Sequence, residues 1–433
     1  MSLQKGDGYM ENLRLGSIGP QVMLLQSVLK TLGFYTGEID GNFGLNTERA
    51  VRRFQRNFSL QSDGVVGELT WRALMPYING YTRYIVKRGD TFYNIARRFS
   101  TTANRIVAAN PSVSPTRLSI GQSIIVPFGN VVKTNINYTY DILSMNVASL
   151  QTTYPFLNVT SIGKSVLGKE LKCIRIGNGL NEVFYSASIH ANEWITSVLL
   201  MKFIENFCRA YVNNGKMYGL NVREVFNSAS IYIVPMVNPD GVDLVTGGLD
   251  TASDAYQNAK IIAENYPIIP FPDGWKANID GVDLNLQFPA GWENARQIKF
   301  AQGFTTPSPR DYVGNGPLTQ PEAISMYDFT LAHNFRLILA YHTQGRVIYW
   351  RFLDYLPPQS REIGERFAKI SGYLLESTPY SSGYAGYKDW FIQNYNRPGY
   401  TIEVGWGTNP LPISQFGTIY SENEGILITG AII

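Results

Sequence analysis

His190 and Glu193 form a His-x-x-Glu unit directly after the apolar run 183–189, in a chain with only three histidines. Imidazole nitrogens and carboxylate oxygens are zinc ligands, and a catalytic zinc takes three protein ligands and keeps one position for water. His342 follows a second strand-like run, 337–341, and is the expected third ligand. A lone His-x-x-Glu is a weak signal, but two histidines at predicted strand ends strengthen it. We therefore predict a site for one zinc ion at His190, Glu193 and His342.

Apolar strand-like runs alternate with helical segments in the last 300 residues or so, and these elements must position the ligands. The predicted strands are 171–176, 183–189, 231–235, 336–341 and 400–404, and the predicted helices are 196–211, 320–333 and 360–375. This alternation predicts an α/β domain whose mixed sheet is flanked by helices. Ligands gather where the strands of such sheets end. The remaining histidine, His333, falls in a predicted helix and is not expected at the site.

Length and composition limit the class of protein. A chain of 433 residues is expected to form two or three domains, and 44% hydrophobic against 16% charged residues indicates packed globular domains. A formal charge of +3 gives no indication of nucleic-acid binding. No run is long and apolar enough to span a bilayer, so no membrane partner is expected. Cys173 and Cys208 are too few for a disulfide framework and are expected to be buried free thiols.

Residues 11–78 contain three predicted helices, 22–33, 48–56 and 68–74, separated by glycine turns. Asn46 or Thr47 is the expected cap of the second helix. The ordered series Leu-Gln-x-x-Leu-x-x-Leu-Gly, Asp-Gly-x-Phe-Gly, Val-x-x-Phe-Gln and Asp-Gly-x-x-Gly-x-x-Thr-Trp covers nearly the whole segment. It resembles the helical peptidoglycan-binding domain.

Residues 82–128 show a strand, two helices and a closing strand. The motifs Tyr-x-Val-x-x-Gly-Asp-Thr and Leu-x-x-Gly-Gln-x-Ile-x-Val-Pro resemble a LysM module, and Asp90 or Thr91 is the expected cap of its first helix. That resemblance implies binding to the N-acetylglucosamine-containing glycan of cell walls. The two segments share no sequence, so they are two different modules rather than a repeat.

Residues 134–433 carry five ordered motifs: His190-x-x-Glu193, 237–241, 281–289, 342–345 and 400–405. Together they resemble the M14 metallocarboxypeptidase family, and they span essentially the whole segment. The resemblance implies zinc ligands at His190, Glu193 and His342 and a general base at Glu403, within the pattern Thr-Ile-Glu-x-Gly. The chemistry agrees, because a carboxylate beside an activated water can take its proton and pass it to the leaving amine.

Lys276 stands where the family has the arginine of a Trp-Arg pair, and it is the candidate for stabilising the oxyanion. A lysine supplies one point charge rather than a two-pronged donor, and the alternative interpretation is a solvated surface lysine. Asp240 is either a group that orients a ligand histidine or part of a structural cap.

Leu286 is the main departure from the family pattern, which has Asn-Arg where this chain has Asn285-Leu286. The family's arginine grips the terminal carboxylate of the substrate, so another group must hold it here. Arg346 is the preferred candidate, and Arg310, Arg351 and Arg397 are also near motif ends. Asn285 remains a substrate-binding candidate. Tyr380 resembles the family's mobile capping tyrosine, with Tyr384 as its competitor and plain loop packing as the alternative to both.

Two wall-binding modules before an M14 domain without that arginine resemble the branch of the family, found in sporulating bacilli, that cuts the γ-D-glutamyl-meso-diaminopimelate bond. The implied partners are peptidoglycan glycan and its meso-diaminopimelate stem peptides, and the implied location is the cytoplasm or the spore or forespore. Residues 1–8 lack the apolar core of a signal peptide, although an export signal removed from this chain would look the same. Two alternatives remain: a carboxypeptidase that trims the end of the stem, and a non-catalytic wall-binding protein.

Overall fold

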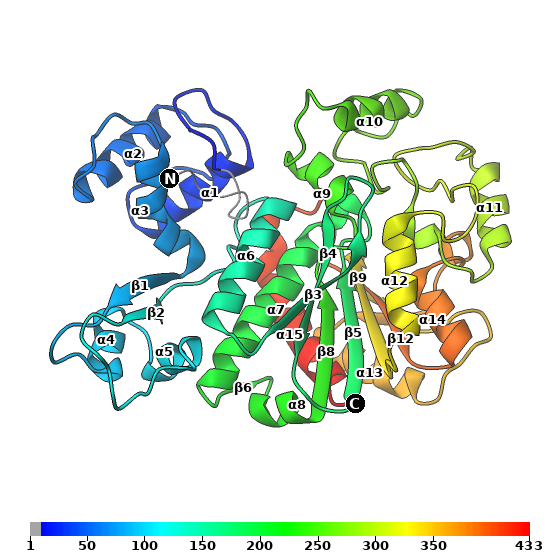
Figure 1. The fold of residues 1–433 in the computed structure, drawn as a ribbon. Helices are drawn as coiled ribbons and strands as arrows, with labels where there is room; N and C mark the ends of the chain where they lie inside the picture. Colours follow the sequence, from blue (N-terminus) through cyan, green and yellow to red (C-terminus); the bar gives the residue numbers. More distant parts are fainter. Residues whose placement is uncertain (1–9) are drawn as a thin grey trace. The chain divides into compact units, whose positions relative to one another are not determined.

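A computed structural model of the chain describes residues 10–433 (Figure 1). It forms two compact units: one contains the described residues up to Leu157 together with Cys208–Asn213, and the other contains Asn158–Phe207 and Asn214–Ile433. The segment 1–8, weighed above as a signal peptide, lies outside the described residues. No helix within residues 10–433 is both long and apolar enough to cross a membrane.

The first segment folds as the predicted three helices, α1 (Pro20–Thr31), α2 (Leu45–Asn57) and α3 (Glu68–Asn79). The predicted cap of the second helix was wrong, because α2 follows Gly44 and has no side-chain cap. Thr47 lies inside the helix, and its hydroxyl contacts Gln26 Nε2 at 3.2 Å.

Two buried glutamines hold the turns that precede α2 and α3. Gln26 Nε2 donates to Asp40 Oδ1 at 2.8 Å, and its Oε1 accepts from Gly41 N at 3.0 Å. Gln55 Oε1 accepts from Gly64 N in the same way, at 2.9 Å. Gly41 and Gly64 have φ of 74° and 77°, a conformation that favours glycine. The Asp-Gly pairs of the motif are therefore turns fixed by a glutamine from the preceding helix.

The second segment has the predicted β-α-α-β order, with β1 (Tyr81–Ile85), α4 (Phe92–Arg98), α5 (Ala103–Ala109) and β2 (Ser123–Pro127). Its two strands pair antiparallel. Of the two expected caps, Thr91 is the one that caps α4, in a capping box with Asn94. Asp90 instead accepts hydrogen bonds from Lys87 N and the Tyr84 hydroxyl. A helix that follows this segment, α6 (Tyr140–Thr153), is grouped with the first unit.

The second unit is built on an eight-stranded mixed sheet of order β11-β10-β12-β9-β5-β8-β4-β3. The strands are β3 (Asn158–Lys164), β4 (Glu170–Ile176), β5 (Asn181–Ala187), β8 (Ala229–Val234), β9 (Leu337–Thr343), β10 (Val347–Tyr349), β11 (Leu374–Glu376) and β12 (Gly399–Val404). The four central strands, β12, β9, β5 and β8, run parallel to one another. Burial on both faces explains their nearly continuous apolar runs.

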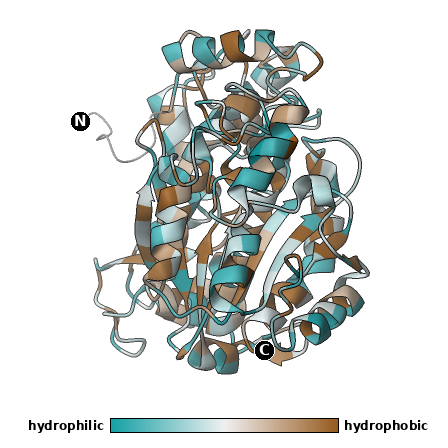
Figure 2. Ribbon diagram, turned by 90° about the vertical axis from the view of Figure 1, so that its right-hand side faces the viewer, coloured by the Kyte–Doolittle hydropathy of each residue, from teal (hydrophilic) through white to brown (hydrophobic). Residues whose placement is uncertain are grey.

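Helices cover both faces of this sheet, as predicted (Figure 1). On one side lie α7 (Ile195–Val212), α13 (Ser360–Ser371) and α15 (Phe416–Gly430); on the other lie α12 (Pro321–Leu331) and α14 (Tyr387–Tyr395). Neighbouring residues of β5 face opposite layers: the Tyr185 hydroxyl donates to Leu427 O in α15 at 2.9 Å, whereas the Phe184 ring lies 6.0 Å from that of Tyr387 in α14. Apolar residues line the strands between the helices (Figure 2).

Shorter elements complete the second unit. They are β6 (Lys216–Met217), β7 (Leu220–Asn221), α8 (Val222–Ser228), α9 (Pro239–Thr246), α10 (Asp254–Glu264), α11 (Trp292–Ala301) and the 3-10 turns η1 (Ala191–Glu193), η2 (Leu284–Leu286), η3 (Tyr380–Ser382) and η4 (Ile413–Gln415). Cys173 and Cys208 are buried free thiols, as expected.

Several predicted boundaries differ from the structure by a few residues, and for two of them the backbone shows the cause. The strand predicted to reach Ile189 ends at Ala187, because Ser188 has a positive φ of 49° and turns the chain toward η1. The helix predicted over 360–375 ends at Ser371, where Gly372 with a φ of 74° closes it, and the edge strand β11 follows.

The stability of the core beneath the site should depend on the side chain of Phe184. Its side chain is 0% exposed and its ring stacks on Phe335 at 5.2 Å. Phe184→Ala is expected to lower the free energy of unfolding by about 3–5 kcal/mol, measured by chemical denaturation. Leu180→Ala, at a side chain that is 99% exposed, is the control and should change it by less than about 0.5 kcal/mol. If Phe184→Ala and Leu180→Ala changed the free energy of unfolding by the same amount, the packing around Phe184 would not stabilise the domain.

Candidate metal and hydrolytic site

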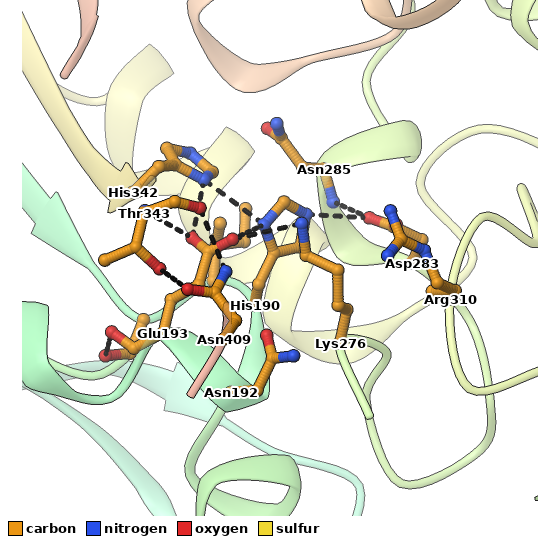
Figure 3. Close-up of polar contacts among 12 residues, drawn as sticks. His190, Asn192, Glu193, Lys276, Asp283, Asn285, Arg310, His342, Thr343 and Asn409 are labelled. Atoms are coloured by element: carbon orange, nitrogen blue, oxygen red, sulfur yellow. Dashed lines mark hydrogen bonds and ion pairs between the residues drawn. The ribbon is translucent and has the colours of Figure 1, made fainter. Parts of the chain in front are cut away.

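Two neighbouring parallel strands bring the three predicted ligands together (Figure 3). His190 follows β5 directly before the turn η1, Glu193 is the last residue of that turn, and His342 lies near the end of β9, which pairs with β5. Among residues 10–433, these three offer ligand atoms that all lie within 4.8 Å of one another. His342 Nδ1 lies 3.2 Å from His190 Nδ1 and 3.0 Å from Glu193 Oε2. Two imidazole nitrogens and a carboxylate form the donor set that suits zinc.

Two of the predicted ligands, His190 and Glu193, have further protein partners that fix their orientation. His190 Nε2 lies 3.1 Å from Asp283 Oδ1, so a proton on Nε2 leaves the Nδ1 lone pair facing the other ligands. Glu193 Oε2 accepts from Thr343 N at 3.2 Å. Burial opposes ionisation of Asp283, but His190 and Lys276 beside it hold the pKa of this carboxyl well below its usual range. The ligands are therefore preoriented by the fold.

Asp283, rather than Asp240, is the carboxylate that contacts His190. Asp240 accepts from Leu167 N at 2.9 Å and pairs with Lys169 at 3.2 Å, whereas the side chain that caps α9 is that of Asn238. The sequence did mark Asp283 as a candidate, because this residue belongs to the 281–289 motif and directly precedes η2.

Lys276 lies at the site and not on the surface. Its Nζ is 3.1 Å from Glu193 Oε1, and its carbonyl accepts from Ala191 N at 3.0 Å, which ties this loop to the turn η1. Burial by itself lowers the pKa of the ammonium, but the nearby carboxylates, Glu193 first among them, raise it above the usual value. Lys276 therefore places a positive charge next to the predicted metal ligands.

Glu403 lies on β12 directly opposite His342 in the parallel pairing of β12 with β9. Burial and the neighbouring charge of Glu193 raise the pKa of its carboxyl to about 8, against the opposing effects of Lys276 and His190. A carboxyl next to the predicted ligands is placed to exchange a proton with a water molecule at the site.

These groups open into a cavity of about 390 Å³. It is lined by His190, Lys276, Asp283, Asn285, Leu286, Lys299, Gln302, Arg310, Asp311, His342, Tyr349, Thr378, Pro379, Ser381, Ser382, Gly386, Lys388, Asp389, Thr401 and Glu403. Asn285 is therefore brought to the ligands, and its Oδ1 accepts from Tyr387 N at 3.1 Å.

Arg346, the preferred carboxylate partner in the sequence analysis, is not among the lining residues. Its Nη2 contacts Glu422 at 2.6 Å, and its guanidinium lies over the rings of Tyr373 and Trp406. The structure thus gives Arg346 a packing role instead. Of the other arginines considered, Arg310 does line the cavity and contacts Asp311 at 2.6 Å.

Tyr380 stands at the edge of the cavity in η3 and is 72% exposed. Its neighbours Pro379 and Ser381 line the cavity, although Tyr380 itself does not. Tyr384 is buried, with its ring 5.7 Å from that of Tyr380. His333 lies just after α12, where its Nδ1 contacts Phe329 O, and takes no part in the site.

Four cationic or acidic groups of the cavity were not singled out from the sequence. They are Lys299, Asp311, Lys388 and Asp389. No motif marked Lys299 or Asp311. The last two stand in the segment after Tyr380, where only the tyrosines had been considered.

Family models match three parts of the chain. The model described as zinc carboxypeptidase (peptidase M14) matches residues 144–424, the peptidoglycan binding domain model matches 18–74, and the LysM domain model matches 84–127.

Two relatives and one solved structure extend these matches. The protein named gamma-D-glutamyl-L-diamino acid endopeptidase 1, from Lysinibacillus sphaericus, is 51% identical over 294 residues, 68% of this chain and 72% of that protein. A spore cortex-lytic enzyme from Oceanobacillus iheyensis is 37% identical over 83 residues, 18% of this chain and 30% of that protein. Carboxypeptidase A from Helicoverpa armigera has the same fold, with a TM-score of 0.51 at 18% identity over 78% of this chain and 80% of that one. This chain belongs to the zinc carboxypeptidase family, M14.

Proposed function

We propose that this protein is a zinc-dependent peptidoglycan hydrolase that cuts the stem peptide between γ-D-glutamate and meso-diaminopimelate. The observation that carries the proposal is the cavity itself. It is lined by His190 and His342 of the His-Glu-His donor set, by Glu403 and by Leu286, which stands where ordinary family members have an arginine for a free C-terminal carboxylate. The name of the 51% identical relative, a gamma-D-glutamyl-L-diamino acid endopeptidase, supports the same bond.

His190, Glu193 and His342 would hold one zinc ion, and Asp283 and the Thr343 amide would keep the ligands aligned. Zinc, when bound in such a site, polarises the scissile carbonyl and lowers the pKa of water to roughly 7. Glu403 takes the proton of the attacking water and returns it to the leaving amine nitrogen. Lys276 opposes the negative charge that develops on the carbonyl oxygen.

The modules before this domain support a wall polymer as the substrate. Two weakly binding modules joined to an enzyme raise its local concentration on the glycan. The spore cortex-lytic relative supports a place in the spore, where the peptidoglycan cortex would supply the stem peptides.

The tetrapeptide L-Ala-γ-D-Glu-meso-diaminopimelate-D-Ala tests the bond that is cut. The zinc-loaded protein should release L-Ala-D-Glu, identified by mass, and Glu403→Gln should lose about 100-fold or more in rate because the proton acceptor is gone. Release of D-Ala alone would favour a trimming carboxypeptidase. Absence of any product from a protein that holds zinc would favour a non-catalytic wall-binding protein.

Asp283→Asn is expected to weaken zinc binding about 10- to 100-fold, since the amide no longer attracts the His190 proton as a carboxylate does. Competition with a chromogenic chelator measures the affinity. Asp240→Asn is the matched control, because Asp240 is an equally buried aspartate that contacts Lys169 and no ligand. Equal losses in the two variants would contradict the orienting role of Asp283.

Lys276→Met is expected to lower kcat about 100-fold or more with little change in KM, because the charge acts on the transition state. Lys276→Arg should recover part of the rate. Zinc content is measured in parallel, since Lys276 also contacts Glu193. A variant that keeps zinc and full kcat would show that Lys276 has no part in the reaction.

A further inference from the structure

A second cavity, of about 490 Å³, lies at the edge of the sheet that β11 forms, and none of its residues has a role in the proposed hydrolysis. It is lined by Trp350, Arg351, Arg361, Leu375, Glu376 and Ser377. Tyr349 of β10 pairs with Glu376 of β11, so the residues that follow these two strands lie side by side. Tyr349 and Thr378 line the catalytic cavity, and a chain neighbour of each lines this one. The two cavities therefore adjoin at the ends of β10 and β11.

Trp350 is the most unusual side chain of this second cavity. Of the seven tryptophans in the chain, five are buried, whereas Trp350 is half-buried and Trp406 is 50% exposed. The guanidinium of Arg346 lies over the ring of Trp406, 5.5 Å from its centroid. The ring of Trp350 has no aromatic or cationic partner among residues 10–433, and its indole N–H has no acceptor there. A large aromatic ring left open in a cavity is a common anchor for a ligand.

Polar groups of both charge signs surround this ring. Arg351 Nε donates to Ser377 Oγ at 2.7 Å, which fixes the side chain, while its terminal nitrogens have no partner in the described part of the chain. The carboxylate of Glu376 has no hydrogen-bond or ion-pair partner there either. Arg361 has only an exposed ion pair within its own helix, at 2.9 Å, of the kind that contributes little to stability. Donors and acceptors that can still bind a ligand therefore stand around the ring.

This mixture of charges disfavours an ionic ligand. A phosphate or a carboxylate would be repelled by Glu376, and an ammonium group would be repelled by Arg351 and Arg361. A neutral sugar ring meets neither penalty, because its hydroxyl and acetamido groups both donate and accept hydrogen bonds. Its C–H face is apolar and suits the indole ring and the side chain of Leu375. The cavity therefore fits a neutral N-acetylated sugar.

We propose that the cavity beside Trp350 is a saccharide-binding site on the catalytic domain, for a neutral N-acetylated sugar unit of the wall glycan. The sugar lies on the Trp350 ring, and Arg351 and Glu376 bind its hydroxyl groups. The class of ligand follows from the cavity, whereas its source, the glycan that bears the stem peptides, rests on the proposed function. The catalytic domain thus has a contact with the glycan that is separate from the two N-terminal modules.

Fluorine NMR of the full chain labelled with 5-fluorotryptophan tests this site directly. Seven tryptophans give seven signals, and Trp350→Phe and Trp406→Phe assign the two that matter, because each variant loses one signal. Titration with a linear tetramer of N-acetylglucosamine should move the Trp350 signal in a saturable way and leave the Trp406 signal in place. The LysM segment, 82–128, contains no tryptophan, so sugar bound to that module has no signal of its own in this spectrum.

Removal of a polar group from the cavity should weaken the same binding. Glu376→Ala is expected to raise the dissociation constant read from the Trp350 signal about 10-fold, the usual worth of a hydrogen bond to a charged group. Glu224→Ala is the matched control, at an exposed glutamate of α8 that lines neither cavity, and it should leave the constant unchanged. Equal constants in the two variants would contradict the role of Glu376.

The outcomes separate this inference from the proposed function. A Trp350 signal that stays in place, or that moves together with the Trp406 signal, would overturn the inference, and release of L-Ala-D-Glu from the free tetrapeptide would still support the function. A shift with inorganic phosphate or with the free stem tetrapeptide, but not with the sugar, would indicate an anion or peptide site and also overturn the inference. A saturable shift with the sugar in a protein that cuts no stem would support the saccharide site and contradict the function.

Discussion

The parallel pairing of β5, β9 and β12 is the constraint on which the site depends. It places the turn after β5, the end of β9 and Glu403 of β12 at one edge of the sheet, with Glu403 opposite His342. Glu193 and His342, which are 149 residues apart in the chain, thus lie 3.0 Å from each other. Two helical layers and their buried aromatic side chains hold the strands in this order.

The same arrangement brings several charged side chains together in a buried site. Glu193 contacts His190, His342, Lys276 and the Thr343 amide, so its carboxylate is compensated from several sides, and the pKa of its carboxyl is held well below the usual value despite burial. The fold therefore maintains a negative ligand and a positive lysine side by side. The proposed hydrolysis would use both, Glu193 to hold the metal and Lys276 to oppose the charge that develops on the carbonyl oxygen.

Much of this was predictable from the sequence. Apolar runs gave the strands, and the residues at their ends gave His190, Glu193, His342 and Glu403. The family motifs gave Lys276, which the structure places at the ligands. The contact of Asp283 with His190 was missed because spacing in the sequence does not tell which carboxylate reaches a histidine. Arg346 was preferred because it follows His342 closely in the sequence. In the structure its backbone is left-handed, with φ of 52°, and its side chain pairs with Glu422 instead of lining the cavity.

The burial of Lys388 and Asp389 at the cavity could not be predicted from the sequence. Their adjacency in the chain says nothing about burial, and only the packing of α14 against η2 brings them to the cavity. A structure of the zinc-loaded Glu403→Gln protein with an uncut stem tetrapeptide would test the account most directly. The account predicts the γ-D-glutamyl carbonyl between the predicted metal ligands and Lys276, with the diaminopimelate residue on the leaving side of the bond. A stem bound with its C-terminal D-Ala in that place, or in the reverse direction, would contradict it.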